Sequence, residues 1–130
     1  MKVLISTVAG TFSVDPETDD VEPWDGELEL PAAPVLNLPR VVAAAAAGAT
    51  VVAVVNAKPP LLVSYDTGST WRESGRGLPG GRAVAISEDD PDLIVYAARN
   101  RLFLSRNGGI FWTSLAVELP EIDGVAFPGR

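Results

Sequence analysis

The residues with the clearest capacity for chemistry are cations that stand between apolar runs of the sequence. Arginine presents a planar set of N–H donors that matches the oxygens of a carboxylate or a phosphate, so several arginines in one place are typical of an anion-binding site. Two asparagines and an aspartate occupy similar positions and can bind hydroxyl or carbonyl groups. The predicted ligand-binding residues are Arg40, Lys58, Arg82, Arg99, Arg101, Asn56, Asn100 and Asp123.

A second interpretation of these residues needs no ligand. Arg40 and Arg82 each precede an apolar run, and they can pair with Asp123 and Glu121 to hold neighbouring parts of the fold together. The two asparagines are also ordinary turn residues, whose side chains bond to nearby backbone. Both interpretations of the arginines stay open at this point, and the turn interpretation is favoured for the asparagines.

The composition excludes several kinds of chemistry. The chain has no cysteine and no histidine, which excludes disulfides, thiolate chemistry, zinc sites of Cys and His, and histidine-dependent catalysis. We therefore expect no metal and no cofactor. The net charge of −7 opposes binding to nucleic acid. Residues 1–10 are too few and too polar for a signal peptide, and no apolar run has the length of a membrane span, so we expect a cytoplasmic protein with no membrane partner.

The elements that must position these residues are predicted to be short β-strands. Val, Ile, Leu and Ala recur in short runs that 12 glycines and 11 prolines interrupt, which leaves little room for an amphipathic helix. Residues 41–47 are rich in alanine, the best helix former, but a glycine and the valine-rich residues 50–55 follow, so we predict a strand there. The sequence therefore predicts an all-β fold.

The predicted strands belong to a repeat of 41 residues. Residues 64–71 read SYDTGSTW and residues 105–112 read SRNGGIFW, and their first serines are 41 positions apart. A period of about 40 residues is typical of β-propellers, in which each repeat is a four-stranded blade. We expect one blade from residues 40–81 and another from residues 82–120. In the second of these, the four strands are expected at residues 83–87, 93–97, 102–106 and 111–117.

A third repeat is divided between the two ends of the chain. Residues 1–39 match a blade that lacks its inner strand, and residues 121–130 contain an inner strand with no blade behind it. Propellers have about 4 to 8 blades, so three blades cannot encircle a channel, and an unpaired apolar strand promotes aggregation. We therefore expect residues 1–130 to form a single domain, half of a six-bladed β-propeller, which a homodimer completes by exchanging C-terminal strands.

The motif within the repeat carries a family resemblance. Residues 64–71 match S-x-D-x-G-x-T-W in full, and residues 105–112 keep a weaker copy. The sequence thus resembles the Asp-box, or bacterial-neuraminidase-repeat, β-propeller families, which include sialidases and photosystem assembly factors. In these families the motif shapes a turn on the rim opposite the active face, so the resemblance implies a structural role for it. The residues concerned are Ser64, Asp66, Gly68, Thr70, Trp71, Ser105, Asn107, Gly109 and Trp112. A third and weaker copy is expected at Ser13, Asp15 and Trp24.

Two classes of function remain. The first is a non-enzymatic binding or scaffold propeller that recognises an anionic small molecule, a glycan or an acidic peptide of a protein partner at the mouth of the channel. The alternative is a small sialidase-like glycoside hydrolase, which the resemblance implies. Sialidases use an arginine triad with a Tyr and Glu pair, but the only tyrosines here are Tyr65, inside the motif, and Tyr96, in a predicted strand. The first class is therefore favoured.

Overall fold

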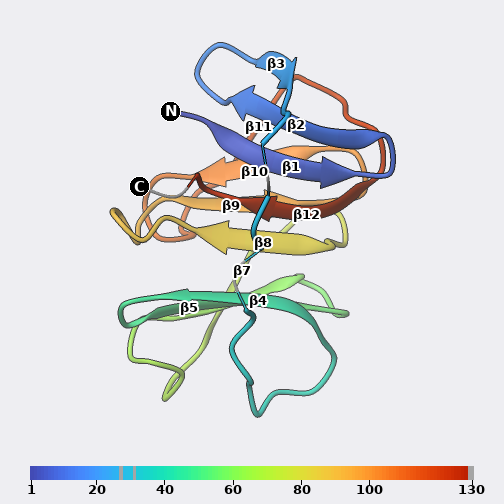
Figure 1. The fold of residues 1–130 in the computed structure, drawn as a ribbon. Helices are drawn as coiled ribbons and strands as arrows, with labels where there is room; N and C mark the ends of the chain where they lie inside the picture. The colour runs from blue at the N-terminus through green and yellow to red at the C-terminus, as the bar shows by residue number, and fades with distance from the viewer. Residues whose placement is uncertain (27, 31, 129–130) are drawn as a thin grey trace.

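Three antiparallel sheets of four strands each make up the fold (Figure 1). The computed structural model describes residues 1–26, 28–30 and 32–128, and these contain no helix. No element of this part of the chain is therefore a helix long and apolar enough to cross a membrane. The strands are β1 (Val3–Thr7), β2 (Gly10–Asp15), β3 (Asp20–Pro23), β4 (Val41–Ala47), β5 (Thr50–Val55), β6 (Leu61–Ser64), β7 (Arg72–Ser74), β8 (Ala83–Ile86), β9 (Ile94–Ala97), β10 (Leu102–Ser105), β11 (Thr113–Ser114) and β12 (Ile122–Ala126). The predicted all-β fold is confirmed.

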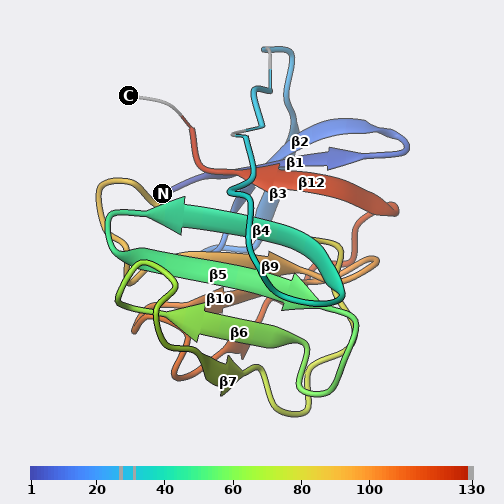
Figure 2. The same cartoon turned by 90° about the horizontal axis from the view of Figure 1, so that it is seen from below.

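Each predicted repeat unit corresponds to one sheet. The terminal sheet has the strand order β12-β1-β2-β3, the alanine-rich sheet has β4-β5-β6-β7, and the central sheet has β8-β9-β10-β11. Figure 2 shows the four strands of the alanine-rich sheet side by side in chain order. The inner strand of the central sheet, β8, contacts both β4 and β12. The three sheets therefore follow one another in an arc, with the central sheet between the other two.

In the structure of the single chain, the C-terminal strand β12 pairs with β1 of the same chain, whereas we expected the β1 strand of a partner to receive it. Leu4 lies opposite Ala126 and Ile5 lies opposite Val125 in the antiparallel pairing of β1 with β12. The connection from β11 to β12 has only seven residues, so β12 stays next to the central sheet, where β1 can pair with it.

The central sheet is buried on both faces. Val95 and Leu104 belong to a core shared with the terminal sheet, while Ile94 and Phe103 belong to a core shared with the alanine-rich sheet. Successive side chains of a strand point to opposite faces, so a strand that is covered on both sides needs an uninterrupted apolar run. All residues of β8, β9 and β10 are accordingly buried.

The inner strands are rich in small residues. The predicted strand at residues 41–47 is confirmed as β4, whose Ala43 and Ala45 pack against the core shared with β8. Inner strands of neighbouring sheets approach one another at the centre of the arc, and small side chains permit that approach. Helix propensity of alanine is therefore overridden, because β4 pairs along its length with the valine-rich β5.

The fourth strand of the central sheet is shorter than expected. Residues 111–117 were predicted as a strand, but β11 contains only Thr113 and Ser114. Leu115 and Leu119 turn inward and are buried in the core between the central and terminal sheets. The chain therefore leaves the sheet early because its next apolar side chains fill the core.

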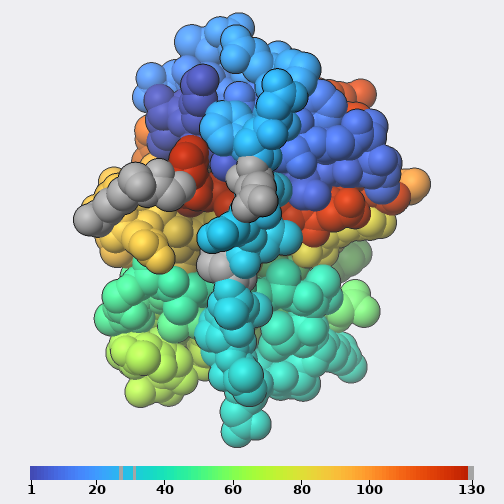
Figure 3. Space-filling model, in the orientation of Figure 1, coloured from blue at the N-terminus to red at the C-terminus, as the bar shows by residue number. Residues whose placement is uncertain are grey.

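The connection from β3 to β4, residues 24–40, crosses the concave side of the arc. It passes in front of β12 and β8 before it reaches β4 (Figures 1 and 3). Leu30 lies so close to the backbone of β12 that a Cβ at Gly124 would be 2.8 Å from the Leu30 Cδ1 atom. This connection has 17 residues, compared with eight for β7 to β8 and seven for β11 to β12.

The contact between Tyr96 and Gly81 gives a first prediction. The Tyr96 ring is fully buried and its hydroxyl donates to the Pro79 carbonyl at 2.7 Å, while a Cβ at Gly81 would lie 2.0 Å from the ring. We expect Gly81→Ala to lower the free energy of unfolding by about 1 to 3 kcal/mol, because the ring has no room to move away. Gly80→Ala is the control, since no atom beyond its two chain neighbours lies within 4 Å of its Cβ position. Urea unfolding that shows equal stability for the two variants would contradict this account of the packing.

Candidate functional site

Four of the eight predicted ligand-binding residues, Arg82, Arg99, Asn100 and Arg101, lie on one edge of the arc, where loops of different strands are joined. The Ile122 N–H donates to the Arg99 carbonyl at 2.8 Å, and the Leu119 N–H donates to the Asn100 carbonyl at 2.9 Å. These bonds join the β11–β12 connection to the β9–β10 loop. The Val8 N–H donates to the Glu121 carbonyl at 2.9 Å and attaches the β1–β2 loop to the same connection.

Glu121 binds two of the predicted arginines. Its Oε1 atom lies 3.1 Å from Arg82 Nη2 and 3.0 Å from Arg99 Nε, and the three residues come from three different loops. The Glu121 side chain is 32% exposed and the Arg99 side chain 71%, so solvent screens these pairs and each contributes about 0 to 1 kcal/mol. Two guanidinium groups share one carboxylate, which leaves one positive charge in excess at this point.

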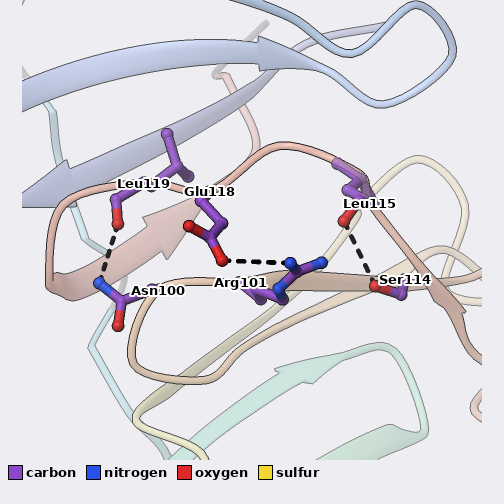
Figure 4. A network of polar contacts seen from close by, with 6 residues as sticks. All are labelled: Asn100, Arg101, Ser114, Leu115, Glu118 and Leu119. Carbon is purple, nitrogen blue, oxygen red and sulfur yellow. Dashed lines mark hydrogen bonds and ion pairs between the residues drawn. The ribbon is translucent and has the colours of Figure 1, made fainter.

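A second set of polar contacts lies on the same edge (Figure 4). Arg101 Nη2 lies 3.1 Å from Glu118 Oε1, and Asn100 Nδ2 donates to the Leu119 carbonyl at 2.9 Å. Ser114 Oγ donates to the Leu115 carbonyl at 3.3 Å. Asn100 and Arg101 thus hold the β9–β10 loop against the β11–β12 connection. These contacts support the interpretation that the side chains stabilise the fold.

The remaining predicted residues are distributed over other elements. The Arg40 carbonyl accepts a bond from the Asn56 N–H at 2.9 Å, which closes the end of the β4–β5 pair. Lys58 is exposed in the β5–β6 loop, and Asp123 is exposed within β12. The expected pairing of Arg40 with Asp123 is not among the ion pairs formed by the described residues.

A groove of about 830 Å³ runs along the inner strands beneath the β3–β4 connection. Its walls are mainly alanine, valine and leucine side chains of β4, β8, β12, residues 28–30 and residues 32–34. Arg82 precedes β8 and lines the groove, and Glu88 and Asp89 line it beyond the other end of that strand. Sequence reasoning missed this groove, because residues 24–40 show no repeat that would reveal where they pass.

The turn after β6 is held by the side chains of the motif. Ser64 Oγ donates to Asp66 Oδ1 at 2.7 Å and accepts from the Gly68 N–H at 2.8 Å. Thr70 donates to Asp66 through its hydroxyl at 2.6 Å and its N–H at 2.8 Å. These bonds lower the pKa of Asp66 from 3.8 to about 2. The bond from the Thr70 hydroxyl has the largest effect, followed by the bond from the Thr70 N–H and then the bond from Ser64. The carboxylate thus binds its own turn.

The turn after β10 repeats this geometry with Asn107 in place of the aspartate. Ser105 Oγ donates to Asn107 Oδ1 at 3.0 Å, and Asn107 Oδ1 accepts from the Phe111 N–H at 2.9 Å. The Gly109 N–H donates to Ser105 Oγ at 2.8 Å. The neutral amide oxygen of Asn107 therefore accepts a bond from the backbone N–H four residues later, as the carboxylate of Asp66 does.

The two turns are also bonded to each other. The Tyr65 hydroxyl donates to the Gly108 carbonyl at 2.6 Å, and Trp112 Nε1 donates to Ser74 Oγ at 2.9 Å. Ser74 Oγ in turn donates to the Gly109 carbonyl. Tyr65 is the exposed one of the two tyrosines, and its hydroxyl helps to join the alanine-rich sheet to the central sheet.

The expected third copy of the motif is only partly present. Ser13 is buried in β2, and Asp15 Oδ1 accepts from the Glu17 N–H at 2.9 Å in the turn that follows. Trp24 lies after β3, whereas Trp71 and Trp112 lie before the fourth strands of their sheets. The proposed equivalence of Trp24 is therefore wrong, because the turn closes within residues 16–19 and does not reach the tryptophan.

Acidic side chains are the residues that could hold a metal ion in a chain without histidine or cysteine. The described residues contain no group of three or more acidic side chains placed to hold a metal ion.

No family model matches the sequence, and no curated protein matches it. Among solved structures, a GH74 enzyme of Niastella koreensis is similar at 23% identity and a TM-score of 0.49, over 91% of this chain and 18% of that one.

The Asp66 turn predicts a pH dependence. The pKa of this carboxyl is lower in the folded chain than in the unfolded chain, so its contribution to stability is complete above about pH 5 and is lost as the pH falls toward 2. Asp66→Asn should flatten the stability profile in that interval while it keeps the fold, since Asn107 already forms such a turn. Asp25→Asn removes the same charge outside the turn and serves as control. Melting temperatures that fall equally steeply with decreasing pH for Asp66→Asn and for the wild type would contradict the assignment.

Proposed function

We propose that this chain is a non-enzymatic binding or scaffold module of the β-propeller class, and that two copies close a six-bladed ring. The observation that carries the proposal is the arc of three sheets, with the inner strands β12, β8 and β4 on its concave side. A second arc related by two-fold symmetry would complete the circle and give each end sheet a neighbour. Each C-terminal strand stays in its own chain in this arrangement.

The charges of the two end sheets support this closure. Residues 1–29 contain eight acidic residues and one lysine, and belong mostly to the terminal sheet. Residues 40–76 contain four cationic and two acidic residues, and belong mostly to the alanine-rich sheet. In a two-copy ring the terminal sheet of one copy meets the alanine-rich sheet of the other, so opposite charges face each other twice.

The edge with Glu121 supports a scaffold role first and an anion site second. Arg82, Arg99 and Arg101 are engaged in ion pairs that join neighbouring loops. The excess positive charge where two arginines share Glu121 favours an anionic ligand, such as a sugar carboxylate, a sugar phosphate or an acidic peptide of a protein partner. Because Glu121 already occupies the guanidinium groups, such a ligand must displace or share it.

Ring closure predicts the mass in solution. Light scattering coupled to size-exclusion chromatography should give twice the 13.6 kDa of one chain. A monomer at every concentration up to the highest attainable would contradict the ring. The same sample should not hydrolyse a panel of fluorogenic glycosides, and reproducible turnover would favour the hydrolase alternative.

The anion site makes a separate prediction. Calorimetric titration with sialic acid, sugar phosphates and acidic peptides should show weak binding that Arg82→Lys reduces, because lysine keeps the charge but loses the planar set of donors. Glu121→Gln should strengthen binding several-fold, since it removes the internal carboxylate that competes for Arg82 and Arg99. If neither the wild type nor Glu121→Gln binds any of these anions, the arginines serve only to join the loops.

A further inference from the structure

The β3–β4 connection exposes apolar side chains on the concave side of the arc. Val35 is 100% exposed and Leu30 is 52% exposed, and the exposure continues into β4 with Val42 at 53%. Apolar side chains that gather in one exposed segment mark an interaction surface more often than single ones do. Residues 30–39 also carry no charged side chain, in a chain whose net charge is −7.

The position of this segment limits what can cover it. The connection crosses in front of β12 and β8, on the side toward which all three inner strands face (Figures 1 and 3). In a ring of two arcs, the concave sides face each other across the two-fold axis. The same segment of the second copy is then the group that lies opposite, as self-complementary contact requires.

We infer that Leu30 and residues 32–42 form a contact with a second copy of this chain, in which the two β3–β4 connections pack against each other inside the ring. This inference rests on the proposed ring and names the surface that holds it together near its axis. Two highly acidic chains repel each other, so their closest approach is favourable where charge is absent and apolar area is available. Val35 contributes most, because its whole side chain is available for burial.

The length of the connection agrees with this role. Its 17 residues can span about 55 to 60 Å when extended, far more than the seven or eight residues that join neighbouring sheets can span. A chain that crosses the open side of an arc needs this length. The extra residues therefore bring an apolar segment to the axis, and a ring assembled in this way is filled at its centre by its own connections.

The test compares two valines that are both exposed. Val35→Asp places a charge at the inferred contact, and Val8→Asp places the same charge at a 66% exposed valine in the β1–β2 loop. Sedimentation equilibrium should show that Val35→Asp raises the dissociation constant of the dimer by at least about tenfold, and that Val8→Asp has little effect. Both side chains are exposed in the single chain, so at concentrations at which the wild type is also monomeric, both variants should unfold at the same temperature as the wild type.

The possible outcomes separate the inference from the ring. A wild-type protein that is monomeric throughout would overturn both. A wild-type dimer that Val35→Asp leaves unchanged would overturn only this inference, and the ring would then be held by its end sheets. If Val35→Asp leaves the dimer intact but does not bind an apolar dye that the wild-type protein binds, the segment and the groove belong to a small apolar ligand instead, and the inference is wrong.

Discussion

The pairing of β1 with β12 is the interaction on which the rest of the structure depends. It joins the first and last strands of the chain in one sheet, with Leu4 opposite Ala126 and Ile5 opposite Val125. Ile5, Val125 and Ile122 from these two strands belong to the core that also contains one face of the central sheet. Without this pairing, that face would be exposed to water, and the edge of β1 would have no strand beside it.

This pairing also decides how the loops are arranged. Once β12 is beside β8, its preceding residue Glu121 reaches both Arg82 and Arg99, and the three loops of the charged edge are joined. The terminal sheet then lies at one end of the arc and the alanine-rich sheet at the other. The chain must travel from one to the other, and it does so through the 17 residues that cross the concave side and roof the groove. The groove and the exposed Val35 are therefore consequences of a sheet that closes within one chain.

Much of the fold could be predicted from the sequence, because its strands are encoded locally. The 41-residue repeat located most strands of the central sheet to within one residue, and the alanine-rich β4 was predicted from the valine-rich run that pairs with it. The partners of the charged residues were less predictable, since an arginine can reach several carboxylates from one loop. Glu118 was not considered, although it pairs with Arg101. The groove could not be predicted at all, because its roof comes from the one connection that has no counterpart in the other repeats. Strand exchange was inferred from the number of blades, and the single chain shows the other pairing, of β1 with its own β12.

A cross-strand disulfide tests the pairing most directly. The chain has no cysteine, so Leu4→Cys with Ala126→Cys introduces a single possible bridge between residues that lie directly opposite in β1 and β12. After oxidation, the protein is unfolded without reductant and its mass is measured. Pairing within one chain predicts a covalent monomer with an internal disulfide, even when the native protein is a dimer. A covalent dimer that reductant converts to monomers would show that the strands are exchanged between chains, and would contradict the account.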